Sequence, residues 1–226
     1  MRRLLELCGP PSGRALDVGC GAGFTGFALA RAGWDVVYLD PTHEMLLETR
    51  AGRRARNLPG EERVVEAWAE AGPFRNGSFR LVVSHRAPHQ FRDVAEFLAE
   101  ARRLTAPGGL VGIADQSPMD GWEEWHNDLE RLRDPTHGSA LSLSQWNQAF
   151  EEAGLQILQA GSVDQPREVE SWIHRVGCTD EVRDEILRTV RSMPEDLESW
   201  HRPHTDAEGR LIVQAPHAVV VARSPG

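Results

Sequence analysis

The sequence predicts an α/β fold with a mostly parallel sheet and helices on both of its faces. Short apolar runs alternate with segments of helical periodicity through the first half of the chain, and glycines follow the first run directly. Strands joined in sequence by helices pair in parallel through right-handed crossovers, and this arrangement produces a doubly wound sheet. Ligands bind such sheets beyond the carboxyl ends of the strands.

The first half contains five predicted strands. GRALDVG (13–19) is a buried strand that ends in glycines, and the helix from Phe24 to Ala32 ends at Gly33. Apolar residues at helical spacing predict a further helix from Phe91 to Leu104, which Pro107-Gly108-Gly109 prevents from continuing. The remaining elements of this half are strands at 34–40, 63–68, 79–84 and 110–115 and a helix at 44–56.

The second half is more helical. It contains predicted helices at 122–133, 144–153, 167–176 and 179–192, a sixth strand at 155–163, and a closing strand or hairpin at 210–223. The length of 226 residues is that of one domain with a cap. We therefore expect a single domain over 1–226, in which 1–115 binds the cofactor and 116–226 supplies the cap and the final strands.

Composition excludes several classes of protein. The net charge of −9 disfavours a general nucleic-acid binder and a protein that binds anionic membranes. All 25 basic residues are arginine, so lysine Schiff-base chemistry is excluded. Three cysteines without CxxC spacing predict neither a zinc site nor a disulfide framework. The absence of a signal-like segment and of a long apolar run predicts a cytoplasmic location.

The strongest local signal is ALDVGCGAGFTG (15–26). A strand ends there, glycines let the backbone approach a ligand, and a helix N-terminus follows. Residues 21–26 satisfy G-x-G-x-x-G, and Asp40 lies 19 residues beyond Gly21, near the spacing of the carboxylate that binds the ribose of NAD. An NAD-dependent oxidoreductase is therefore one interpretation of this segment.

The phase of the strand favours a different interpretation. If Gly21 were the first dinucleotide glycine, Asp17 would occupy an inward apolar position, where an unpaired carboxylate is costly. The other phase places Asp17 at the end of the sheet and the loop at Gly19-x-Gly21-x-Gly23.

In this phase the segment resembles the class I methyltransferases that use S-adenosylmethionine. The resemblance implies that Asp40 accepts hydrogen bonds from two ribose hydroxyls and that Met45, in DPTHEML (40–46), packs against adenine. AWAEAGPFRNGSFRLVVS (67–84) resembles the adenine-edge loop and fourth strand of the family, and EARRLTAPGGLVGIAD (100–115) its next helix, turn and strand. Within the family the chain is most similar to the UbiE-like small-molecule methyltransferases of ubiquinone and menaquinone biosynthesis.

The resemblance implies a Rossmann-like fold with seven strands in the order 3-2-1-4-5-7-6, the last one antiparallel. The cofactor site that it implies consists of Asp17, Gly19, Gly21, Gly23, Asp40, Met45, Trp68, Ala69 and Ser84. The chain departs from the family at two positions, because Trp68 and Arg80 stand where aspartate is common. Trp68 either stacks on adenine or packs in the core. Few residues precede the first strand, so we expect the cap to come from 116–135 and 166–205.

Methyl transfer is an in-line displacement in which positioning and the exclusion of water can supply about 7–11 kcal/mol of the barrier. A base is needed only where the acceptor must lose a proton. SHRAPHQF (84–91) leaves the fourth strand directly toward the predicted site, so His85 and His89 are the catalytic candidates. The alternative for both is a hydrogen bond within the loop or a contact with the cofactor. Asp115 either orients substrate, together with Gln116, or caps the next turn.

Other conspicuous residues have simpler explanations. His137 in DPTHG is expected to bond to the backbone of a turn, and His201 and His204 lack the helical spacing and third ligand of a metal site, so we predict no metal. The tryptophans after residue 116 either line an aromatic acceptor pocket or pack the cap helices; packing is the commoner role. The acidic excess of the second half is expected to be a solvated face, although a cationic acceptor would also fit it.

We therefore expect an S-adenosylmethionine-dependent methyltransferase that moves a methyl group to an O, N or C atom of a small molecule. An NAD-binding oxidoreductase and a non-catalytic, cofactor-binding member of the fold are the alternatives. We expect no nucleic-acid or membrane partner, and either a monomer or a homodimer. DNA amino-methyltransferases are disfavoured because residues 84–87 lack the Asn/Asp-Pro-Pro-aromatic motif.

Overall fold

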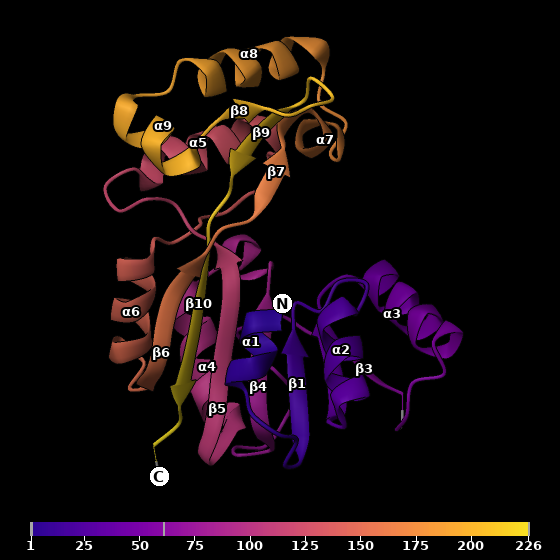
Figure 1. The fold of residues 1–226 in the computed structure, drawn as a ribbon. Helices are drawn as coiled ribbons and strands as arrows, with labels where there is room; N and C mark the ends of the chain where they lie inside the picture. The colour runs from indigo at the N-terminus through magenta and orange to yellow at the C-terminus, as the bar shows by residue number, and fades with distance from the viewer. Residues whose placement is uncertain (1, 61, 226) are drawn as a thin grey trace.

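The computed structural model describes residues 2–60 and 62–225. A seven-stranded sheet forms the larger part of the molecule, and a smaller lobe stands above the carboxyl ends of its parallel strands (Figure 1). The strands of the large sheet are β1 (Arg14–Val18), β2 (Asp35–Asp40), β3 (Arg63–Glu66), β4 (Phe79–His85), β5 (Thr105–Gln116), β6 (Gln156–Val163) and β10 (His217–Arg223).

The strand order is β3-β2-β1-β4-β5-β10-β6, which confirms the predicted topology. β1 pairs in parallel with β2 and β4, and β5 continues the parallel part of the sheet beside β4. β10 is inserted between β5 and β6 and is antiparallel to both. The carboxyl ends of β1, β2 and β4 consequently lie at one edge of the sheet, where the predicted site residues follow them.

Helices cover both faces of the large sheet, and alternating side chains of each strand supply the two cores. Leu16 and Val18 face the core that includes α4 (Val94–Leu104) and α6 (Leu143–Glu152). Ala15 faces the opposite core, which includes α1 (Arg2–Leu7), α2 (Phe24–Ala32) and α3 (His43–Ala55). A continuous apolar strand buried on both faces is what the sequence of 13–19 predicts.

The upper lobe, here called the cap lobe, has a separate small core. Its helices are α5 (Glu123–Arg133), α7 (Val169–His174), α8 (Asp180–Arg191) and α9 (Glu195–His201). A three-stranded antiparallel sheet, in the order β7-β9-β8, completes it, with β7 at Pro166–Glu168, β8 at His204–Thr205 and β9 at Leu211–Gln214. Four segments of chain, at 117–122, 134–142, 164–165 and 215–216, connect the cap lobe to the larger part of the molecule (Figure 1).

Most predicted boundaries agree with the structure to within a few residues, and α2 coincides with its predicted range. Three features were not expected: the short helix α1, the helix α9 and the small sheet of the cap lobe. The predicted element at 210–223 is divided, because β9 pairs within the cap lobe whereas β10 joins the large sheet. None of the helices among the described residues is long and apolar enough to cross a membrane.

Candidate active site

The loop after β1 bends sharply at its glycines. Gly19 and Gly21 have φ values of 65° and 51°, in the left-handed region that favours glycine. At Gly19 a Cβ atom would lie 2.6 Å from the Cβ of Ala87, so the loop also passes very close to the segment after β4. At Gly21, in contrast, a Cβ would meet nothing within 4 Å. The loop is therefore packed on one side and open on the other.

Asp40, the last residue of β2, holds this loop in place. Its Oδ2 accepts a hydrogen bond from the backbone N–H of Gly21 at 2.8 Å, and its Oδ1 accepts one from the N–H of Thr42 at 2.9 Å. The side chain is largely buried. Because each carboxylate oxygen can accept two hydrogen bonds, Asp40 retains acceptor capacity toward a ligand.

A cavity of about 240 Å³, here called the glycine-loop pocket, opens beside these residues. Six of the predicted cofactor-binding residues line it: Gly19, Gly21, Asp40, Met45, Trp68 and Ala69. Its other lining residues are Pro41, Thr42, Glu70, Arg86, Ala87, Gln90 and Phe91. They lie in the segments 40–46, 67–84 and 84–91, which the sequence placed near the site, but none of them was predicted to bind the cofactor.

Three predicted cofactor-binding residues lie outside the lining of the pocket. Asp17 is 1% exposed, and its Oδ2 accepts a hydrogen bond from the N–H of Gly26 in the first turn of α2 at 2.7 Å. Burial, with a further contribution from the charge of Asp40, raises the pKa of Asp17 to about 7. Ser84 is buried and donates to the carbonyl of Val18. Gly23 is the N-cap of α2.

Trp68 is 48% exposed, so the interpretation that it packs in the core is wrong. The guanidinium of Arg92 lies 3.4 Å from the centroid of its indole ring. Met45, on α3, is 37% exposed. Two partly exposed apolar side chains therefore line a pocket that also contains a carboxylate. Arg80, the other departure from the family pattern, donates to the carbonyl of Pro107, outside this pocket.

The structure brings His89 and Asp115 together. Asp115 Oδ1 lies 2.8 Å from His89 Nδ1, and Asp115 Oδ2 accepts a hydrogen bond from the backbone N–H of His89 at 2.7 Å. Burial opposes the protonated imidazole, but the carboxylate of Asp115 outweighs it and raises the pKa of His89 above its ordinary value. His89 belongs to a short 3-10 helix, Pro88–Gln90, whose last residue lines the glycine-loop pocket, whereas His89 itself does not.

His85, the last residue of β4, lines a second and larger cavity of about 770 Å³. This inter-lobe cavity lies between α1, the ends of β4 and β10, and the cap lobe. Arg86 lines both this cavity and the glycine-loop pocket. Burial, reinforced by the positive charge of Arg86, lowers the pKa of His85 to about 3, so its imidazole is neutral at physiological pH. The two catalytic candidates thus lie in different surroundings.

Most of the remaining conspicuous residues of the second half are explained by packing. Trp125 lines a cavity of only about 30 Å³, which is too small for a flat acceptor, and Trp146 is 1% exposed in the large core. Trp172 lines both this small cavity and the inter-lobe cavity. His137 Nε2 lies 2.7 Å from the side-chain oxygen of Asn127, so it bonds to a side chain rather than to the backbone as expected. His201 lies 2.8 Å from the carbonyl of Gln214. Within 2–60 and 62–225 no three His, Cys, Asp or Glu side chains are grouped as metal ligands.

Comparison with known proteins agrees with this arrangement. The family model described as a methyltransferase domain matches residues 16–113. The uncharacterized methyltransferase YcgJ of Bacillus subtilis is 30% identical over 176 residues, which cover 77% of this chain and 69% of that protein. Its solved structure superposes with a TM-score of 0.88 at 24% identity, covering all of both chains.

Two further proteins are similar. A protein of Bacillus halodurans C-125, provisionally named a methyltransferase, superposes with a TM-score of 0.91 at 25% identity, covering 100% of this chain and 98% of that one. A ubiquinone biosynthesis O-methyltransferase of Rhizobium etli is 32% identical over 103 residues, which cover 45% of this chain and 40% of that enzyme.

Proposed function

The chain belongs to the class I methyltransferases, and from that premise we propose that it binds S-adenosylmethionine in the glycine-loop pocket and methylates a small molecule in the inter-lobe cavity. The observation that carries the proposal is the pocket itself, in which an open glycine backbone and the Asp40 carboxylate lie next to two partly exposed apolar side chains.

The chemistry of the pocket fits a methyl donor that contains a nucleoside. Asp40 supplies acceptors for the two hydroxyls of a ribose, since both of its oxygens keep unused lone pairs. Met45 and Trp68 present apolar surface to a flat base, and the absence of a Cβ at Gly21 lets the donor approach the backbone. Asp17 and Ser84 support this site from behind, because they hold α2 and β1 and have no surface in the pocket.

The glycine-loop pocket would hold S-adenosylmethionine, whose sulfonium would supply the methyl group: a bond from the acceptor to carbon would replace the carbon–sulfur bond, and the electron pair of that bond would stay on sulfur. His85 is the better placed candidate for a proton acceptor, because it lines the inter-lobe cavity beside Arg86; its pKa of about 3 leaves the imidazole neutral but makes it a weak base. His89 is a positioning residue, since Asp115 engages its ring and its backbone N–H and so orients the 3-10 helix against the pocket.

Residues 1–226 act as one methyltransferase domain in this proposal. The first half binds the donor, and the cap lobe of the second half closes the acceptor cavity from above and excludes water. The acceptor is a small molecule, in agreement with the ubiquinone biosynthesis enzyme to which the chain is similar.

The experiment that tests the proposal is an assay of S-adenosylhomocysteine release with S-adenosylmethionine and a panel of small hydroxy, amino and activated-carbon acceptors. Turnover with any acceptor supports the proposal. If that acceptor loses a proton, His85→Gln should lower kcat and leave the Kd for S-adenosylhomocysteine unchanged. Binding of the donor without turnover on any member of a broad panel would instead favour the non-catalytic alternative.

A further inference from the structure

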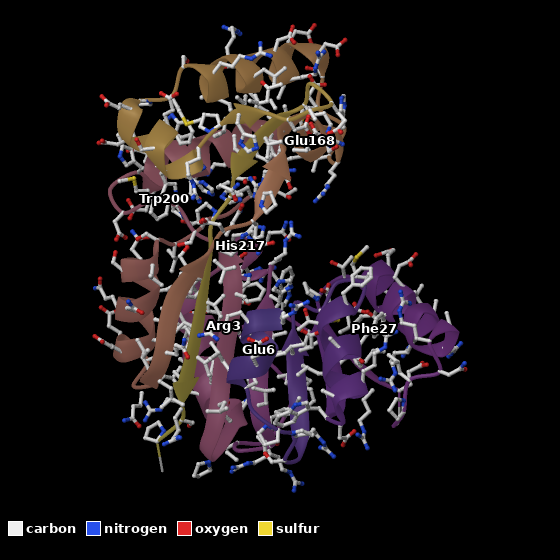
Figure 2. The ribbon with its side chains drawn as sticks, in the orientation of Figure 1. Arg3, Glu6, Phe27, Glu168, Trp200 and His217 are labelled. Atoms are coloured by element: carbon white, nitrogen blue, oxygen red, sulfur yellow. The ribbon has the colours of Figure 1, made fainter. Side chains whose placement is uncertain are left out.

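The inter-lobe cavity is basic although the chain as a whole carries a net charge of −9. Five arginines line it: Arg2, Arg3, Arg86, Arg167 and Arg175. The only acidic residues in its lining are Glu6 and Glu168. Figure 2 shows Arg3 and Glu6 on the side of α1, Glu168 on the side of the cap lobe, and His217 near the junction of the two lobes.

The two acidic side chains of this cavity already have partners. Glu6 lies 3.8 Å from the guanidinium of Arg3. The carboxylate of Glu168 accepts hydrogen bonds from the backbone N–H groups of Glu170 and Ser171, each at 2.8 Å. Among the arginines, Arg167 forms an ion pair with the buried carboxylate of Glu130 at 3.1 Å. The Arg3–Glu6 and Arg167–Glu130 pairs therefore cancel much of their own charge, whereas Glu168 remains an anion that backbone N–H groups bind.

Three guanidinium groups of the cavity remain available. No carboxylate among residues 2–60 and 62–225 forms a salt bridge with Arg2, Arg86 or Arg175, and all three side chains are exposed. His85 and His217 add no carboxylate to the lining; burial keeps both imidazoles neutral, with pKa values lowered to about 3 and about 4. The cavity consequently has a positive potential, which concentrates anions.

Arg86 has a special place in this arrangement. It follows β4 directly, its φ of 56° lies in the left-handed region that non-glycine residues rarely adopt, and its N–H donates to the carbonyl of Ala114. Such backbone strain of about 1–3 kcal/mol persists where surrounding structure imposes it, and it clusters at functional sites. Arg86 lines both cavities, and it therefore lies between the proposed donor site and the proposed acceptor site.

We propose that the methyl acceptor of this protein carries an oxyanion, a carboxylate or a phosphate, that binds in the inter-lobe cavity to Arg86 and Arg175. The inference rests on the proposed function, since it names the substrate class of the same site. A guanidinium binds either anion through two parallel hydrogen bonds, and the cavity is large enough for a drug-sized molecule. The expected alternative of a cationic acceptor, suggested by the acidic second half, does not fit this lining.

The test uses the protein loaded with S-adenosylhomocysteine and two probes, citrate as a polycarboxylate and inorganic pyrophosphate as a phosphate. Each is titrated by calorimetry at constant ionic strength, so that general screening is equal in all samples. We expect saturable binding of at least one probe. Tighter binding of citrate assigns a carboxylate to the acceptor, and tighter binding of pyrophosphate assigns a phosphate.

Arg175→Gln and Arg86→Gln should each reduce the affinity for the bound probe roughly 10- to 100-fold, as expected for loss of a charged hydrogen-bonding partner. Arg31→Gln, which removes an exposed arginine outside both cavities, is the matched control and should leave the affinity unchanged. Arg175 lines only the inter-lobe cavity, so Arg175→Gln should bind S-adenosylhomocysteine like the unmodified protein.

The inference is overturned if neither probe saturates, or if both cavity variants bind the probes as well as the control does. Either result, obtained while S-adenosylhomocysteine still binds, would refute the anionic acceptor and leave the proposed function intact. Absence of S-adenosylhomocysteine binding would refute the proposed function first and the inference with it.

Discussion

Replacing Gly19 with alanine tests how closely the glycine loop packs against the segment after β4. Gly19 has a φ of 65°, and an added Cβ would lie 2.6 Å from Ala87 Cβ and 3.0 Å from the Phe91 ring. Gly108 is a matched control, because its φ is 73° but an added Cβ would meet nothing within 4 Å. The two substitutions share a backbone penalty and differ in crowding.

The expected magnitudes follow from these two terms. A left-handed backbone costs an alanine about 1–2 kcal/mol, and this term applies to both variants. Insertion of a methyl group into a packed site costs about 1–3 kcal/mol more, and this term applies to Gly19→Ala alone. The free energy of unfolding should therefore fall by about 1–2 kcal/mol in Gly108→Ala and by about 2–5 kcal/mol in Gly19→Ala.

Urea unfolding of both variants beside the unmodified protein measures the difference. Calorimetry with S-adenosylhomocysteine adds a second readout, since Ala87 and Phe91 line the glycine-loop pocket and must move in Gly19→Ala. That variant should bind more weakly, whereas Gly108→Ala should bind normally. Losses of stability that agree within ~0.5 kcal/mol, with equal affinities, would refute the close packing of the loop.

Three further predictions concern buried charges. Because burial raises the pKa of Asp17 to about 7, the free energy of unfolding should fall as pH rises from the unfolded pKa of about 3.9 toward 7. Asp17→Asn should abolish this fall and raise the free energy of unfolding by roughly 4 kcal/mol at most above pH 7. Urea unfolding across this pH range measures both effects. The pKa of His89 is raised, so its pair with Asp115 stabilises the fold fully below about pH 6.5, and this stabilisation is lost as pH rises through the folded pKa. The melting temperature of His89→Gln should therefore differ most from that of the unmodified protein at low pH. A difference in melting temperature that does not change with pH would contradict this prediction. Burial acts to raise the pKa of Glu130, but Arg167 and other nearby cations lower it to about 2. Glu130→Gln should therefore lower the free energy of unfolding in urea by about 3–5 kcal/mol near neutral pH, and this loss should shrink as pH falls from about 4.3 toward 2. A loss below ~1 kcal/mol would show that the ion pair is dispensable.

The large sheet and the glycine-loop pocket were accessible from the sequence because their signals are local. Apolar runs at 13–19 and 34–40 identify strands buried on both faces, and a glycine cluster or an aspartate directly after such a run identifies the edge where a ligand binds. The order of strands and the side chains of Asp40 and Met45 in the pocket could be expected from the family resemblance alone.

The cap lobe was less accessible because its contacts join distant segments. β8 has two residues and β7 three, which is too short for a periodic pattern, and each pairs with β9 only in the folded chain. Likewise, the bond between His89 and Asp115 joins residues 26 positions apart. No sequence pattern predicts a hydrogen bond between two residues that are so far apart in the chain.

The basic cavity illustrates the same limit for charge. Arg2, Arg86 and Arg175 come from the first helix, the end of a central strand and the cap lobe, and only the fold brings them to one wall. The composition of residues 116–226, with 20 acidic and 10 basic groups, pointed in the opposite direction. Net charge describes the solvated surface, whereas the charge of a cavity depends on which side chains line it.

The most direct test of the central claim is titration calorimetry with S-adenosylhomocysteine on the unmodified protein, Asp40→Asn and Asp40→Ala, with NAD as the competing ligand. We predict one saturable site for S-adenosylhomocysteine, no binding of NAD, and an affinity reduced roughly 10-fold or more in Asp40→Ala. Asp40→Asn keeps one acceptor oxygen for the N–H of Gly21 or Thr42, so circular dichroism and a smaller loss in this variant separate the loss of a ligand contact from a collapsed loop. Absence of binding to the unmodified protein, equal affinity in Asp40→Ala, or binding of NAD in place of S-adenosylhomocysteine would contradict the assignment of the glycine-loop pocket.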